Sequence, residues 1–145
     1  MKAINNITAG LAGAIVLNIL HESAKRLFAD APRVDLVGEE ALSDILKSAG
    51  AEPPKGNALY AATLAADVAS NALYYSFIGI GKKENLLLRG AGIGFAAGIG
   101  ALTLTKPLGL NDEPVNRTNT TKALTVAWYL IGGLVTALVM KEIDK

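Results

Sequence analysis

The sequence predicts an all-α integral membrane protein, with four transmembrane helices in an antiparallel bundle and a short amphipathic helix at the membrane interface in the first loop. Hydrophobic residues make up 51% of the 145 residues, and charged residues only 19%. Charged residues are also absent from four long windows, which are 3–20, 56–81 apart from Asp67, 90–105 and 123–140. A helix needs about 20 apolar residues to cross a hydrocarbon core of about 30 Å, and each window with its apolar flanks is long enough.

The first span is predicted at 4–28, and it ends before Pro32 because proline disfavours helical conformation at the residue before it. The segment 34–49 follows, and its apolar residues recur at helical spacing between charged ones. It is too short and too charged to span. We therefore expect it to lie on the membrane surface or to cover the helix ends as a lid, and to end before Pro53 and Pro54.

Three further spans complete the bundle, and they are predicted at 57–78, 86–104 and 123–141. A tight turn joins the second span to the third, and the polar loop 106–122 leads to the fourth. Thr120 or Thr121 is expected to cap the fourth helix, because a threonine hydroxyl can accept from a free amide of the first turn. An even number of spans places both termini on one side. We treat residues 1–145 as a single membrane domain.

The composition excludes several classes of function. Fourteen basic residues face thirteen acidic ones, so no excess of positive charge points to a nucleic-acid partner. Because there is no cysteine and only one histidine, we predict no thiolate chemistry, no cofactor and no resident metal.

Membrane lipid is the expected partner, and the compact, loop-poor chain favours a prokaryotic cytoplasmic (inner) membrane. A soluble bundle is the alternative, but each helix would then need a polar face, and these windows are apolar all round.

The third span is rich in small residues. They form two stripes with a spacing of four, Gly90, Gly94 and Gly98 in one and Gly92, Ala96 and Gly100 in the other. Such stripes let helix backbones approach closely in lipid, where van der Waals contact rather than hydrophobic burial drives association. Two stripes predict neighbours on two sides, so we expect the third span to be central. Tight packing within one chain is favoured over the alternative, a homodimer contact.

Asp67 is the most unusual residue of the apolar windows. A charged side chain at the bilayer centre costs about 2.5–3.5 kcal/mol on insertion scales, so such residues face the protein interior and have partners. Asp67 belongs to a stripe of polar residues spaced by three or four, which is Thr63, Asp67, Asn71 and Tyr74. The first span offers a matching stripe, Asn18, His21 and Glu22, followed by Lys25.

The two stripes are expected to meet. If the first two spans are antiparallel neighbours, the constant rise per residue places Asn18 level with Asp67, and Glu22 level with Thr63. We therefore predict one polar pocket beneath the segment 34–49, formed from Asn18, His21, Glu22, Thr63, Asp67, Asn71 and Tyr74. A purely structural interpretation also exists, in which Glu22 pairs with Lys25 and Asp67 with Asn71 to fix helix register.

Three functions fit such a pocket. The favoured one is a non-enzymatic membrane protein whose pocket binds or moves a small solute, an ion or a proton. The second is an intramembrane enzyme or lipid-binding protein that uses the carboxylates and the histidine near the headgroups. The third is a structural or accessory scaffold. A transporter needs a path open to both sides, an enzyme needs a polar cluster reachable from one face, and a scaffold needs every polar group satisfied internally.

Overall fold

The computed structural model describes residues 2–145, and within that range it contains helices and no strand. The helices are α1 (Ala3–Leu27), α2 (Val34–Ser48), α3 (Asn57–Ser76), α4 (Leu86–Thr103), α5 (Glu113–Asn116) and α6 (Asn119–Ile143), with two short 3₁₀ turns, η1 (Phe77–Gly79) and η2 (Lys83–Asn85), between α3 and α4. The predicted all-helical class is confirmed.

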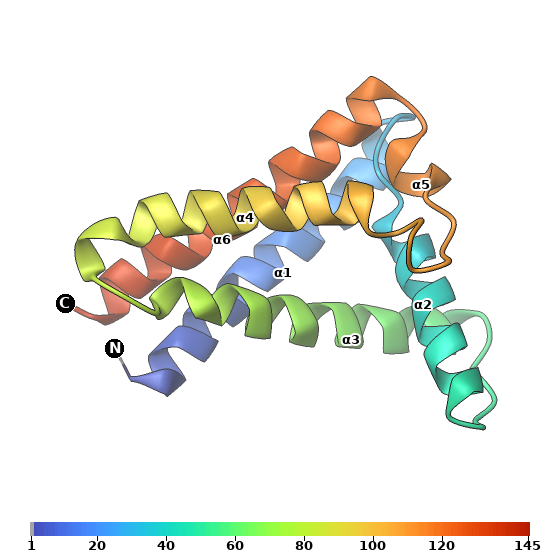
Figure 1. Ribbon diagram of the computed structural model, residues 1–145, viewed down its shortest axis with the longest axis horizontal. Coiled ribbons are helices and arrows are strands. Elements are labelled where there is room, and N and C mark those ends of the chain that lie inside the picture. Colours follow the sequence, from blue (N-terminus) through green and yellow to red (C-terminus); the bar gives the residue numbers. More distant parts are fainter. Residues whose placement is uncertain (1) are drawn as a thin grey trace.

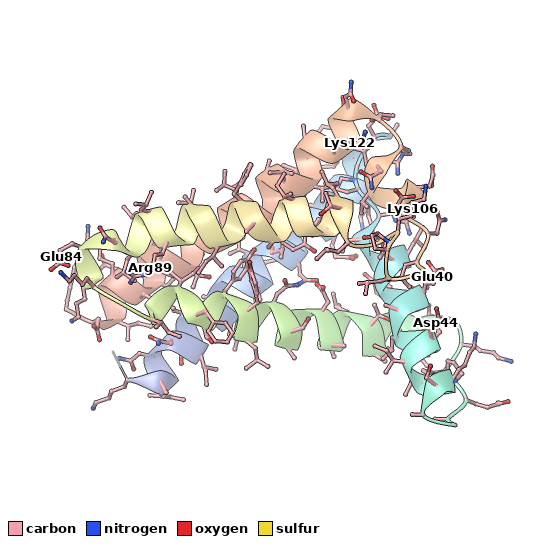
Figure 2. All side chains as sticks on the ribbon, viewed as in Figure 1. Glu40, Asp44, Glu84, Arg89, Lys106 and Lys122 are labelled. Atoms are coloured by element: carbon pink, nitrogen blue, oxygen red, sulfur yellow. The ribbon has the colours of Figure 1, made fainter. Side chains whose placement is uncertain are left out.

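Three segments are long and apolar enough to cross a membrane, which are α1, Lys83–Thr103 and α6. The helix α3 is not among them, because Asp67, Asn71 and three tyrosines lower its hydropathy. The labelled charged side chains gather at the two ends of the molecule: Glu84 and Arg89 at one end, and Glu40, Asp44, Lys106 and Lys122 at the other (Figure 2). Three apolar helices between two charged ends are typical of a membrane protein.

The long helices lie in the spatial order α3, α1, α6, α4. The helix α1 packs against α3 on one side and α6 on the other, and α4 packs along α6. Successive long helices run in opposite directions, and both termini lie at one end (Figure 1). Since α4 hardly touches α3, the expectation that the third span is central is wrong within one chain.

Glycine allows the close contact between α4 and α6. A Cβ atom added at Gly94 would lie 2.6 Å from the carbonyl oxygen of Tyr129, and one at Gly90 would lie 2.6 Å from that of Gly133. Gly98 makes the same kind of approach to Val126. The second predicted stripe does not pack in this way. A Cβ at Gly92 would meet nothing within 4 Å, and one at Gly100 only Leu104, at 3.6 Å, because α4 has a single neighbour along its length.

The loops fix the positions of the helix ends. Arg89 holds the turn between α3 and α4, because its guanidinium donates to the carbonyl oxygens of Ile78 and Lys82 at 2.8 and 2.7 Å. The N-cap of α6 is Thr118, whose hydroxyl accepts from the amide of Thr121 at 3.0 Å. The predicted cap at Thr120 or Thr121 is therefore wrong, since the hydroxyl of Thr121 is buried and donates instead to the carbonyl of Asp30 in the α1–α2 connection.

Candidate functional site

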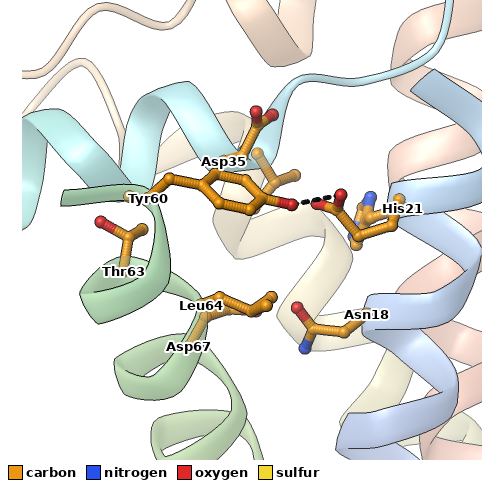
Figure 3. A pocket seen from close by; sticks show the side chains of 10 residues that line it. Asn18, His21, Asp35, Tyr60, Thr63, Leu64 and Asp67 are labelled. Carbon is orange, nitrogen blue, oxygen red and sulfur yellow. Dashed lines mark hydrogen bonds between the residues drawn. The ribbon is translucent and has the colours of Figure 1, made fainter. Parts of the chain in front are cut away.

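A small cavity lies where α2 crosses the ends of α1 and α3 (Figure 3). Three helices line it: Asn18, His21 and Glu22 from α1, Val34, Asp35 and Gly38 from α2, and Tyr60, Thr63, Leu64 and Asp67 from α3. The space open to the centre of a water molecule is about 30 Å³. One water needs about 10–15 Å³ measured in this way, so the cavity has room for one or two waters or a small ion.

The structure brings most of the predicted pocket residues together. Asn18, His21, Glu22, Thr63 and Asp67 all line the cavity, as the predicted α1–α3 register requires. The other two predicted residues turn away from the cavity towards α4. Asn71 is buried beside Asp67 and donates to its Oδ1 at 3.0 Å, and Tyr74 donates to the carbonyl of Ile93 at 3.1 Å.

Lys25 is the centre of a charged network at the mouth of the cavity. Its ammonium donates to Glu22 at 2.8 Å, to Asp35 at 3.4 Å and to the hydroxyl of Tyr60 at 3.2 Å. The hydroxyl of Tyr60 donates in turn to the other oxygen of Glu22, and the ammonium lies 4.7 Å from the centre of the Tyr60 ring. The network links α1, α2 and α3 and holds them in register around the cavity.

A second basic residue completes this network from the α2 side. Arg33 donates from Nε and Nη2 to the two oxygens of Asp35, at 2.9 and 2.8 Å, in the bidentate geometry that makes such pairs strong. Burial alone would raise the pKa of the Asp35 carboxyl, but the hydrogen bonds from Arg33 and the charges of Arg33 and Lys25 hold it below its usual value. Glu22 and Asp35 are thus matched by two cations.

Among residues 2–145 no ion pair involves Asp67. Lys25 and Arg33, the two cations of the network, bind other carboxylates. Its hydrogen bond from Asn71 engages one carboxylate oxygen. Asn18 faces it across the cavity, with an amide that also donates to the carbonyl of Ala14 at 3.0 Å (Figure 3). Among the carboxylates that line the cavity, Asp67 alone is held by neutral groups.

Two further polar groups at the cavity lack partners within residues 2–145. His21 is 7% exposed, and neither of its ring nitrogens makes a hydrogen bond. The hydroxyl of Thr63 is also buried and unbonded. A buried polar group left unpaired costs about 1–3 kcal/mol, so folded proteins complete such groups with water or an ion. Asp67, which pairs with no cation, and His21 and Thr63, which lack hydrogen-bond partners among these residues, therefore line one cavity that has room for a water molecule or a small ion.

The loop that carries α2 is fixed by long-range hydrogen bonds. Arg117, in the connection before α6, donates to the carbonyl oxygens of Ala29 and Ala31, both at 2.7 Å. The amide of Arg33 donates to the carbonyl of Pro114 at 3.0 Å. These bonds hold the start of α2 against α5 and the N-terminal end of α6, and so they position Asp35 over the cavity.

Sequence reasoning missed two of the polar residues that line the cavity, Tyr60 and Asp35. Tyr60 precedes Thr63 by three positions and Asp67 by seven, so helical spacing places it on the same face. This spacing would have been enough to predict Tyr60 as a residue of the pocket. Asp35 is placed by the hydrogen bonds of the α1–α2 connection to residues far along the chain, and no local pattern encodes them.

No protein-family model matches the chain, and neither the curated proteins nor the solved structures include a significant match. The described residues, 2–145, contain no cluster of three or more histidines, aspartates and glutamates arranged to hold a metal ion. The groups of the cavity that lack an ion-pair or hydrogen-bond partner among the described residues are one carboxylate that has no cation, one imidazole and one hydroxyl.

Proposed function

We propose that the chain is a four-span membrane protein whose cavity binds a proton or a small monovalent cation at Asp67. The observation that carries the proposal is the lack of a cation beside this carboxylate, while the neighbouring carboxylates have theirs. Sheltering an unpaired charge from water is costly, and a bound proton or cation removes that cost. The unpartnered His21 and Thr63 supply further ligands or hold a bridging water.

The size of the cavity narrows the choice of ligand. A space of about 30 Å³ for water centres suits a hydrated proton or a bare monovalent ion. A scaffold that used these residues only for packing would satisfy each of them internally, and His21 and Thr63 count against that alternative.

The proposal treats α3 as a membrane span in addition to α1, α4 and α6. Its length of 20 residues suits a crossing, and Asp67 is its only charged residue. Of the polar residues that lower its hydropathy, Asn71 and Tyr75 are buried and Asp67 lines the cavity, whereas Leu73 is 59% exposed on its outer face. Hydrocarbon would therefore meet an apolar surface on α3, as on the other three long helices. A prokaryotic cytoplasmic membrane stays our expectation for its location.

Access is proposed from the α2 side. The hydrogen-bonded series Arg33, Asp35, Lys25, Tyr60 and Glu22 leads from a partly exposed side chain to the cavity wall, and each member carries or accepts exchangeable protons. Further along the chain from the α2 end, Leu17 of α1 and Tyr75 of α3 are fully buried in the interior. This arrangement supports uptake from one face rather than an open path through the protein.

Infrared spectroscopy of the protein in lipid nanodiscs, in which each variant is compared with the wild type, tests the proposal. At pH 7 exposed carboxyl groups are ionised, because their pKa values are about 4. In buffer whose only cation is the bulky choline, we expect the wild type to show the carbonyl band of a protonated carboxyl group. Asp67→Asn should remove that band. The matched control Asp44→Asn, on the exposed face of α2, should keep it.

Adding a small cation distinguishes a site that binds a cation from a site that binds only a proton. If Na⁺ or K⁺ competes for the site, the band shrinks as the salt concentration rises, and if the site takes only a proton, the band is insensitive to salt. A wild type that shows no such band in choline buffer, or an Asp67→Asn variant that keeps it, would overturn the proposal.

A further inference from the structure

A second cavity of the molecule is a groove between α3 and α4. These helices are joined by a short turn at one end, and they hardly contact each other beyond the hydrogen bond from Tyr74 to Ile93. The groove has two overlapping parts of about 450 and 440 Å³, within the range of about 300–1,000 Å³ that ligand pockets occupy. The residues common to both parts are Ser70, Asn71, Gly100, Ala101, Leu104 and Tyr129.

Four polar side chains of the groove already have hydrogen-bond partners, and Asp67 and Tyr129, which also line it, are not among these four. The hydroxyl of Ser70 donates to the carbonyl of Asp67 at 3.1 Å, and the hydroxyl of Thr105 to that of Ala101 at 2.6 Å. Asn71 and Tyr74 have the partners described above. These four side chains make no demand for water, so the groove is suited to an apolar occupant.

The apolar part of the lining comes mainly from α4 and the underside of α2. On α4 the small residues Gly100 and Ala101 leave space where a larger side chain would close the gap between the helices. Leu104 and Leu108 stand at the rim, 58% and 72% exposed. Since Lys83–Thr103 is long and apolar enough to span a membrane, this opening faces hydrocarbon if α3 spans as proposed above.

We propose that the groove between α3 and α4 binds an acyl chain of a membrane lipid. The chain enters beneath α2, passes Leu104 and Gly100, and ends against Tyr74, where α3 and α4 come together. This site is distinct from the cation cavity, although Asp67 borders both.

Photolabelling tests the proposal. The protein is reconstituted in nanodiscs of phosphatidylcholine that carries a diazirine group on one acyl chain, and adducts are mapped by mass spectrometry after illumination. We expect adducts to concentrate on groove residues of α3 and α4. Gly100→Phe should fill the groove and lower labelling there at least fivefold. The matched control Gly92→Phe, on the open part of the same helix, should leave it unchanged, because a Cβ there meets nothing within 4 Å.

Two outcomes would overturn the proposal. One is labelling spread evenly over all outward helix faces and unaffected by Gly100→Phe. The other is a second copy of the chain in the groove. Since the sequence has no cysteine, Ser70→Cys introduces a unique thiol at the groove wall, and efficient disulfide-linked dimers of this variant would indicate that occupant. The infrared band assigned to Asp67 reports on the cation site separately, so the lipid site and the cation site can fail independently.

Discussion

Replacement of Lys25 by methionine is expected to lower the free energy of unfolding by about 2–4 kcal/mol. The ammonium binds Glu22 and Asp35, whose side chains are 23% and 13% exposed, and its loss leaves carboxylates without a partner in a poorly hydrated site. Breaking a buried ion pair on one side costs about 3–5 kcal/mol, and the partial exposure of Glu22 reduces that figure. Methionine keeps most of the volume and the helix propensity, so the charge is the main change.

The chain contains a matched control for this prediction. Lys145 pairs with Glu142 at the same spacing and the same distance of 2.7 Å, but both side chains are about two-thirds exposed. Lys145→Met should change stability by at most about 1 kcal/mol, since exposed pairs contribute little. Chemical unfolding of both variants in detergent micelles measures the difference. Equal effects of the two substitutions would contradict the account of the site.

Gly94→Leu is expected to destabilise the fold by about 3 kcal/mol or more, at the upper end of what overpacking costs. A Cβ at this position would lie 2.6 Å from the carbonyl oxygen of Tyr129 and 2.9 Å from the Cα of Leu130. Both contacts are with backbone atoms of α6, which cannot rotate aside. The helix α4 would therefore have to move away from α6 and lose the contact surface that three glycines create.

Gly92→Leu is the control, because it makes the same change two residues away on the open face of α4. It should leave the thermal unfolding temperature and the α4–α6 distance at wild-type values. That distance can be followed by pairs of spin labels on introduced cysteines, since the chain has none of its own. A destabilised Gly92→Leu variant, or a Gly94→Leu variant with the native α4–α6 distance, would show that the helix pairing is wrong.

Helix positions were largely predictable, because apolar windows and their flanking prolines and glycines are local features. The prediction of 34–49 agrees with α2 to within one residue, and the opposition of Asn18 and Asp67 followed from helical rise alone. Whether α3 spans the membrane is harder to predict from composition. Averaged over the helix, Asp67 and Asn71 lower its hydropathy, whereas their spacing on one helix face predicts that they face inward, where Asn71 donates to Asp67.

The remaining features depend on contacts that sequence patterns do not encode. The stripe of Gly92 and Gly100 permits a close approach, but small residues cannot reveal whether a neighbour is present, and α4 has one on a single side. Asp35 reaches the cavity because Arg117 holds the α1–α2 connection from a position more than eighty residues away. Such a contact forms only when the helices have already packed.

The central claim is that a proton or cation, with its water, completes the polar groups around Asp67. An experimentally determined map at high resolution, from protein in lipid nanodiscs, tests it most directly. We predict density for a water molecule or an ion within hydrogen-bonding distance of Asp67, His21 and Thr63. A dry cavity with these three side chains still unpartnered, or an Asp67 carboxylate turned out of this cavity, would contradict the account.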